Sequence, residues 1–348
     1  MTNSRIRQSN FELLRIVCIL LILSMHCAAQ STITSFDSPN EWLAHAVNSI
    51  GNIGVTCFIL ISGFFGVRFK ADRFVQLILL TTFYCIVVHL FNHGLQFDSS
   101  FIKAALVVPF YNNWFITCYL LLMLFAPFFN ELCESMERTA FRNLLVLGVI
   151  GFSILPTIFN TPYYTIIYGG GKCFVYVVFL YFVGRYIRKY HDTTCSCKKA
   201  FGWLLLFQAL INVINFSLQH IMHKPCHIWS MDCSPLILAS AIAVFFLFKA
   251  MTFQSRVVNW ISSSVLAVFL LDALRIWVNG FIHIEQYSDE PGFVFWLGTL
   301  IAATFAVTLL IDKVRILLFG KIEQKSVEAI IKLAMKVSRF FLPAIHKL

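Results

Sequence analysis

Ten long apolar segments run through the sequence and limit what the chain can fold into. A helix that spans a membrane needs about 20 mostly apolar residues, and each of the ten comes close to that length. Hydrophobic residues make up 59% of the 348 and charged residues 13%, whereas a soluble globular chain has roughly 45–50% and 25%. We therefore predict an all-α integral membrane protein, a bundle of about ten transmembrane helices. The predicted spans are residues 12–29, 46–66, 74–91, 114–130, 142–159, 173–188, 201–219, 235–251, 257–279 and 292–312.

The 27 Lys and Arg residues are concentrated in alternate loops between these spans. One set of loops, together with both ends of the chain, carries 22 of them, the opposite set carries three, and Arg15 and Arg275 lie inside spans. Short cytoplasmic loops collect Lys and Arg, so we predict that both termini are cytoplasmic. The net charge of +10 is thus explained by topology, and we expect membrane lipids rather than nucleic acid as partners.

The chain divides into a transmembrane domain, residues 1–319, and a basic carboxyl-terminal part, residues 320–348. Within this second part apolar residues recur every three to five positions, interleaved with Lys325, Lys332 and Lys336. This pattern predicts an amphipathic helix that lies on the anionic inner leaflet. We expect it to be an anchor without a catalytic role.

The amino-terminal segment has a second interpretation, a cleavable signal peptide. Arg5 and Arg7, the apolar run and Cys27-Ala28-Ala29 fit that pattern. Glu12 and Arg15 lie in or beside the apolar run, which argues against cleavage. We therefore expect the segment to remain as the first span.

The eleven cysteines form no C-x-x-C pair, and most lie in spans as small apolar residues. Cys226 and Cys233 share one external loop and can form a disulfide if that compartment is oxidising. His220, His223 and His227 are spaced three and four residues apart in the same region. No Cys or carboxylate stands at a fixed interval from them, so we predict no metal site.

Ionisable side chains inside spans are energetically costly and indicate function. In the first span, His26 follows Arg15 by eleven residues, which is within about 20° of three helical turns, so both lie on one face and about 16 Å apart along the axis. Glu12 is three residues before Arg15, close enough to pair with it. In the ninth span, Asp272 is expected at a depth similar to that of His26, where it can pair either with His26 or with Arg275.

Four segments of the sequence resemble the membrane-bound acyltransferase family 3, in the order and at the spacing of that family. They are NFELLRIVCILLILSMH at residues 10–26, GNIGVTCFILISGFFG at 51–66, NNWFITCYLLLMLFAPFFN at 112–130 and FLYFVGRYIRKY at 179–190. The signature of the family is an Arg followed by ten residues and then a His. The resemblance implies that Arg15 and His26 are this conserved pair. Its basic motif, two cations three residues apart, matches Lys70 and Arg73, with Arg68 nearby. Members commonly have His where this chain has Asp272, which puts in doubt a role based on a second His.

The resemblance implies an acyltransferase, transferring groups other than aminoacyl groups, that O-acylates cell-surface carbohydrates from the bacterial inner membrane. The expected donor is a cytoplasmic acyl-CoA, usually acetyl-CoA, and no permanently bound cofactor is expected. The expected acceptor is a cell-surface or exported glycan of the cell envelope, such as lipopolysaccharide or exopolysaccharide.

We expect the donor to be bound by Arg15, with Glu12, and by Arg68, Lys70 and Arg73, because arginine forks bind phosphate oxygens. His26 acts either as general base on the sugar hydroxyl or as the nucleophile that forms an acyl-His, with Asp272 as its partner. On the acceptor side we place four residues. They are Asn112, Asn113, Trp114 and Arg275.

Two other functions fit a basic polytopic protein with buried charges. A transporter or flippase of lipid-linked sugars is expected to show internal repeats and helices broken at Gly or Pro in matching halves, and the sequence shows neither. A sugar polymerase is expected to carry a large external loop, and no long loop is present. We therefore predict O-acyl transfer, with transport as the alternative.

Overall fold

The computed structural model describes residues 8–96, 98–106, 113–159, 169–192 and 195–345, and this part of the chain is helical without a strand. The protein is therefore an all-α integral membrane protein, as predicted. The α-helices are α1 (Ser9–Ala28), α2 (Pro39–Gly51), α3 (Ile53–Phe65), α4 (Ala71–His93), α5 (Ser99–Ala105), α7 (Trp114–Ser135), α8 (Arg138–Val149), α9 (Leu155–Ile158), α11 (Phe174–Tyr190), α12 (Cys197–Met222), α13 (Pro235–Lys249), α14 (Arg256–Ser262), α15 (Val265–Leu270), α16 (Arg275–Ile282) and α17 (Phe293–Ile345). Short turns of 3₁₀ or π helix join them at η1 (Ile150–Ile154), η2 (Gly169–Gly171), η3 (Ile228–Ser230), η4 (Asp272–Leu274) and η5 (Ile284–Tyr287).

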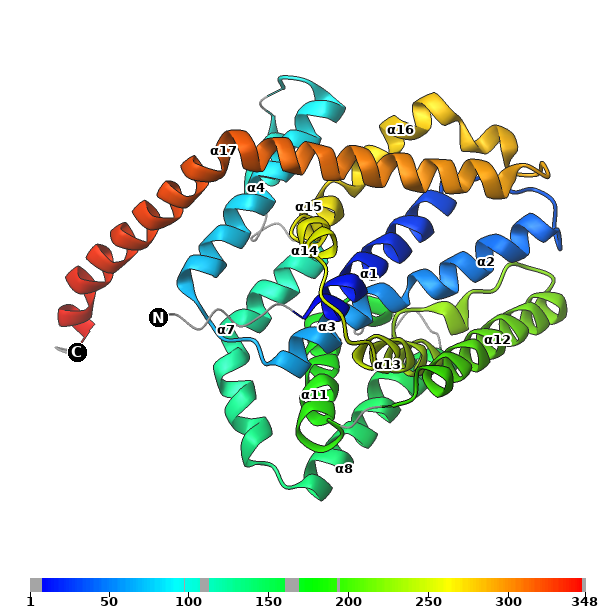
Figure 1. The fold of residues 1–348 in the computed structure, drawn as a ribbon, viewed down its shortest axis with the longest axis horizontal. Helices are drawn as coiled ribbons and strands as arrows, with labels where there is room; N and C mark the ends of the chain where they lie inside the picture. Colours follow the sequence, from blue (N-terminus) through cyan, green and yellow to red (C-terminus); the bar gives the residue numbers. More distant parts are fainter. Residues whose placement is uncertain (1–7, 97, 107–112, 160–168, 193–194, 346–348) are drawn as a thin grey trace.

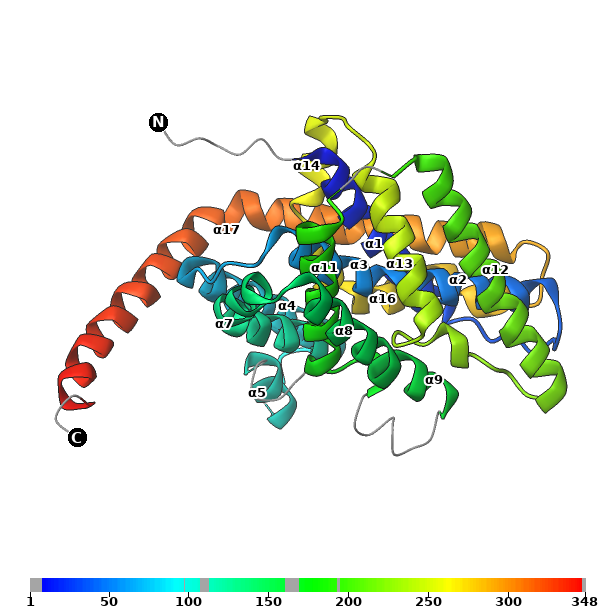
Figure 2. The same cartoon turned by 90° about the horizontal axis from the view of Figure 1, so that it is seen from below.

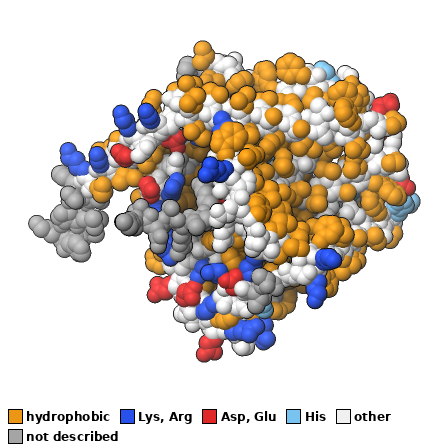
Figure 3. Space-filling view, viewed as in Figure 1, with side chains coloured by type: hydrophobic (Ala, Val, Ile, Leu, Met, Phe, Trp, Pro, Cys, Tyr) orange, Lys and Arg blue, Asp and Glu red, His pale blue; other side chains and the backbone are white. Residues whose placement is uncertain are grey.

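Helices lie at all ten predicted positions, although they differ in length. Among the described residues, 8 helical segments are long and apolar enough to cross a membrane, and the number is 9 if one bent pair counts as a span. The remaining predicted span, residues 173–188, corresponds to α11, which has 17 residues. Large apolar side chains face outward from these helices, such as Trp203 and Leu310, and Figure 3 shows apolar side chains over a broad area of one face. Lipid is the solvent that suits such a surface.

The ninth predicted span is broken, and the prediction of one continuous helix over residues 257–279 is wrong. Its two halves, Arg256–Leu270 and Asp272–Ile282, meet at an angle of 73°. Leu271 at the junction has φ −91° and ψ 3°, outside the helical range. No Gly or Pro stands at the junction. The sequence predicted partners for Asp272, but it did not reveal that the helix breaks where Asp272 meets them.

Helix α1 lies in the middle of the bundle (Figure 1) and packs against α2, α3, α13, α14, α15 and α17. Its apolar side chains are buried on several sides, as Leu14, Cys18 and Ile19 show. Its first residue is also tied down, because Ser9 Oγ donates to Asn259 Oδ1 of α14 at 3.1 Å. The helix that carries Arg15 and His26 is therefore the part of the fold with the most neighbouring helices.

Helices α3 and α11 approach so closely that only glycine fits between them. A Cβ atom on Gly63 would lie 2.3 Å from the Tyr181 carbonyl oxygen, and one on Gly184 would lie 2.5 Å from the Leu60 carbonyl oxygen. Small residues allow this backbone contact between membrane helices, where packing replaces the hydrophobic effect as the source of association. The contact fixes α3, and with it the chain segment that follows Phe65.

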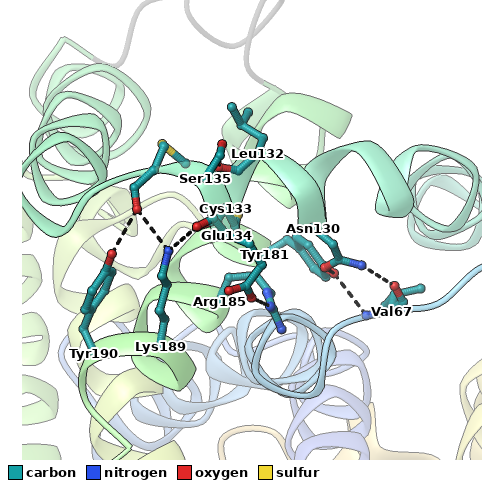
Figure 4. Close-up of polar contacts among 11 residues, drawn as sticks. Val67, Asn130, Leu132, Cys133, Glu134, Ser135, Tyr181, Arg185, Lys189 and Tyr190 are labelled. Carbon is teal, nitrogen blue, oxygen red and sulfur yellow. Dashed lines mark hydrogen bonds and ion pairs between the residues drawn. The ribbon is translucent and has the colours of Figure 1, made fainter.

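Polar side chains of α7 and α11 hold that following segment (Figure 4). Asn130 Nδ2 donates to the Val67 carbonyl oxygen at 2.8 Å, the Val67 amide donates to Tyr181 Oη at 3.0 Å, and the Tyr181 hydroxyl donates to Asn130 Oδ1 at 2.6 Å. Lys189 Nζ donates to the carbonyl oxygens at the end of α7, those of Cys133, Glu134 and Met136. Three of the four segments that carry the family resemblance therefore meet here.

Helix α17 continues without a break from the tenth span through the carboxyl-terminal part to Ile345. Its second half leaves the bundle in both views (Figures 1 and 2). The predicted boundary between residues 319 and 320 lies inside this helix. The placement of its basic part on the inner leaflet, and the cytoplasmic location of both termini, stay predictions.

The cysteines and histidines of the loop before α13 form no cross-link among the described residues. Cys226 and Cys233 are both buried free thiols. His220 Nε2 lies 3.3 Å from Asp37 Oδ2. No cluster of three or more His, Cys, Asp or Glu side chains that could hold a metal ion occurs in the described part of the chain.

The contact between α3 and α11 predicts a large effect of one methyl group. Gly63→Ala should lower stability by about 1–3 kcal/mol, the usual cost of overpacking, because the backbones must separate. Thermal unfolding in detergent measures this as a lower midpoint. Gly298→Ala is the matched control, since a Cβ there meets nothing within 4 Å. Equal midpoints for the two variants would contradict the close packing.

Candidate active site

A hydrogen-bonded chain of three residues joins α1 to the break in the ninth span. The Nδ1–H of His26 donates to Asp272 Oδ2 at 2.8 Å, and Arg275 Nη1 donates to the same oxygen at 2.5 Å. Arg275 Nη1 also donates to the Asp272 carbonyl oxygen at 3.1 Å. The two partners that the sequence left open for Asp272 are thus both present, and they share one carboxylate oxygen.

The hydrogen bond at Nδ1 determines what His26 can do. With its proton on Nδ1, the neutral imidazole has a free electron pair on Nε2. Nε2 has no hydrogen-bond partner among the described residues, and the side chain of His26 is 34% exposed. His26 is therefore oriented by a carboxylate and open on its other side, which suits a base or a nucleophile.

The helix break places the Asp272 carboxylate. At the 73° bend a short 3₁₀ turn, Asp272–Leu274, joins α15 to α16, so the carboxylate lies at the junction of the two halves. Asp272 Oδ1 and Arg275 Nε are buried and have no partner in the described part of the chain. A buried polar group without a partner lowers the stability of the fold by about 1–3 kcal/mol. A hydroxyl or a water molecule that forms a hydrogen bond with either atom therefore binds favourably.

Arg15 is held near the other end of α1. Its Nη1 donates to Glu12 Oε1 at 2.7 Å, as predicted, and Glu12 Oε2 accepts a hydrogen bond from Ser262 of α14. Arg15 lines a cavity of about 230 Å³ between α1, α3, α7 and the ninth span. The sequence predicted the pair with Glu12, whereas Ser262 was not predicted, since it comes from α14, which is distant in sequence.

A second cavity of about 490 Å³ lies next to this one, and both are lined by Leu77, Tyr119, Ser263 and Leu266. Arg68 and Arg73 line the second cavity. The structure therefore brings these two predicted cations and Arg15 to two adjoining cavities. Lys70 is exposed at the start of α4 and does not line either cavity.

The cavity that Arg15 lines extends along α1 toward His26. Its wall includes Arg15 and, two turns further on, Ile22, which are about 10 Å apart along the helix axis. His26 is one turn beyond Ile22, a further rise of about 6 Å. The imidazole itself is not part of the wall of either cavity.

The residues predicted for the acceptor side are described only in part. Asn113 is the amino-terminal cap of α7, where its side chain accepts from the Ile116 amide at 3.2 Å. Trp114 begins α7 and packs edge to face against Phe115. Asn112 lies outside the described residues. Arg275, the fourth, is the partner of Asp272.

A second carboxylate near His26 was not predicted. Asp232 is 7% exposed, its Oδ2 lies 3.9 Å from Lys172 Nζ, and it is within electrostatic range of His26. The glycines before Lys172 allow that loop to pack closely against the backbone beside Asp232, because a Cβ on Gly171 would lie 2.8 Å from the Cys233 amide nitrogen. The available signal was one acidic residue in the short sequence WSMDCSP before the eighth span.

Comparison with known proteins identifies one family. The model of acyltransferase family 3, described as an acyltransferase domain, matches residues 8–312. These residues contain His26, Asp272 and Arg15, and also Arg68 and Arg73 of the second cavity. No curated protein and no solved structure matches the chain.

The three-residue chain at Asp272 predicts a measurable coupling. Asp272→Ala should lower stability by about 2 kcal/mol, because it leaves Arg275, only 22% exposed, without its partner. The double variant Asp272→Ala/Arg275→Ala should lose less than the sum of the single losses, as thermal unfolding in detergent would show. Glu290→Ala, at an exposed carboxylate, is the control. Strict additivity would contradict the ion pair.

Proposed function

The chain belongs to acyltransferase family 3, and on that premise we propose that it is an O-acyltransferase that acts on a glycan. The donor is a cytoplasmic acyl-CoA, in the simplest case acetyl-CoA. The acceptor is a hydroxyl of a cell-surface or exported polysaccharide. The protein is a multi-pass membrane acyltransferase, and this family membership favours acyl transfer over the alternative of sugar transport.

One observation carries this proposal. His26, with Nδ1 fixed on Asp272 at 2.8 Å and Nε2 open, stands one helical turn beyond a cavity that begins among arginines. A cation-lined entrance suits the phosphates of coenzyme A. We propose that the thin pantetheine arm extends from this entrance along α1, so that the thioester reaches the imidazole.

In the direct route, His26 Nε2 takes the proton from the sugar hydroxyl as the oxygen attacks the thioester carbonyl carbon. The carbon–sulfur bond then breaks, and the leaving thiolate of coenzyme A takes this proton from Nε2. Asp272 stabilises the imidazolium that forms between these two steps. General base catalysis of this kind contributes typically 10²–10⁴-fold.

In the other route, Nε2 attacks the carbonyl carbon itself, the carbon–sulfur bond breaks, and coenzyme A leaves as its thiolate, which gives an acyl-His. The sugar hydroxyl then attacks the acyl carbon, the bond from that carbon to Nε2 breaks, and the hydroxyl proton passes to the thiolate. The open side of His26 serves both routes. They differ in one observable, because only the second labels His26 with the acyl group when acceptor is absent.

The acceptor is proposed to bind on the side of the membrane opposite the arginines. Asn112 and Asn113 offer hydrogen bonds to hydroxyls, Trp114 offers a face on which a sugar can stack, and Arg275 has an unpartnered Nε. In a bacterial inner membrane this side faces the cell envelope. The glycan substrates of envelope assembly are available there.

His26→Ala should abolish acyl transfer while the protein remains inserted and folded, since the side chain is partly exposed and contributes little packing. Membranes incubated with radiolabelled acetyl-CoA and candidate glycans measure the transfer. His191→Ala, at an exposed imidazole of the opposite end, should keep full activity. Full activity of His26→Ala would contradict the catalytic role proposed for His26.

Arg15→Ala should raise the KM for acyl-CoA about 10- to 100-fold, the loss expected for a charge-assisted hydrogen bond of about 1.5–3 kcal/mol. Steady-state kinetics on membranes checks this, with Arg256→Ala, an exposed cation of α14, as control. A change confined to kcat would place Arg15 in the chemical step instead. Mass spectrometry of the surface polysaccharide from cells with and without the gene identifies both the acceptor and the acyl mass.

A further inference from the structure

A third arginine lines the second cavity, the one of about 490 Å³, together with Arg68 and Arg73. This residue, Arg315, lies on α17, three residues beyond the part of the chain that matches the family. Its side chain is 11% exposed, so it is more enclosed than Arg68 and Arg73, which are exposed. The question is what this guanidinium faces.

One edge of the Arg315 guanidinium is fixed by buried groups. Nε donates to Asp312 Oδ1 at 2.9 Å and to Tyr84 Oη at 3.0 Å, and the Tyr84 hydroxyl donates to the same Asp312 oxygen at 2.6 Å. Asp312 is 1% and Tyr84 0% exposed. This edge is a permanent part of the contact between α4 and α17.

The other edge is bound by a carboxylate that is more accessible. Arg315 Nη1 donates to Glu323 Oε2. Glu323 Oε1 accepts from Gln76 Nε2 at 2.9 Å, and Gln76 Oε1 accepts from Arg73 Nη1 at 3.1 Å. A continuous chain of hydrogen bonds therefore crosses from Arg315 to Arg73 through one acidic side chain.

We propose that Arg315 binds a phosphate group of the acyl-CoA donor, and that Glu323 occupies the phosphate position until the donor displaces it. This inference rests on the proposed function. A carboxylate and a phosphate bind the same donors of a guanidinium, so Glu323 Oε2 is the group that a phosphate oxygen replaces. Displacement of Glu323 also releases Gln76 and leaves three arginines facing the phosphates.

The fixed and the exchangeable edges have different roles. Asp312 and Tyr84 orient Arg315 whether or not a donor is bound. Glu323 lies two helical turns beyond Arg315 on α17, and its side chain is 15% exposed. It therefore competes with the donor as an internal anion, and its removal should tighten binding.

The test measures binding of coenzyme A, without an acyl group, to the purified full chain in detergent by titration calorimetry. Glu323→Gln should lower the Kd about 3- to 10-fold and Arg315→Gln should raise it about 10-fold or more. Glu328→Gln, at an exposed carboxylate five residues further along α17, should leave it unchanged. Adenosine 3′,5′-bisphosphate and pantetheine are the two probe fragments, and the variants should affect only the first.

A Kd for Glu323→Gln that is unchanged or higher overturns the inference. So does an effect of Arg315→Gln that is equal on both fragments. Arg315→Lys, with a thermal midpoint matched to the wild type, keeps the result interpretable if Arg315→Gln unfolds. If coenzyme A binds and His26-dependent transfer is observed while these variants behave as wild type, only the inference fails; if the wild type does not bind coenzyme A, the inference and the proposed function fail together.

Discussion

One oxygen atom, Oδ2 of Asp272, connects the parts of this structure on which the chemistry depends. It accepts from His26 on the central helix α1 and from Arg275 on the second half of the broken span. Without that carboxylate the imidazole loses its orientation, the guanidinium loses its partner, and the break in the helix loses its polar support. The cavity that runs along α1 ends within one turn of the same point.

Much of this arrangement was predictable, because a helix has a fixed period and a membrane has a fixed depth. Arg15 and His26 lie eleven residues apart on α1, so their common face needed only the pitch of the helix. The similar depth of His26 and Asp272 followed from counting residues into two spans. Burial of ions in lipid then made each of these residues a candidate for function.

Other features depend on contacts between segments that are distant in sequence. No Gly or Pro in the sequence predicts the 73° break at Asp272. At the break Asp272 pairs with side chains of α1 and α16, which come together only in the folded protein. Asp232 comes near His26 only because the loop of Gly169–Gly171 packs against its backbone. In the sequence, Arg315 is one of many Lys and Arg residues that the charge asymmetry of the loops explains. Only the fold shows that it lines the same cavity as Arg73.

The Asp312–Arg315 contact also bears on where this protein can be cut. The family match ends at Asp312, whereas Asp312 is 1% exposed and its ion-pair partner lies beyond that end. A fragment trimmed to the matched residues would keep the carboxylate and Tyr84 but discard the guanidinium, which leaves an uncompensated charge in the interior. The evolutionary unit is therefore shorter than the folding unit, and expression of the former alone should yield misassembled, protease-sensitive protein.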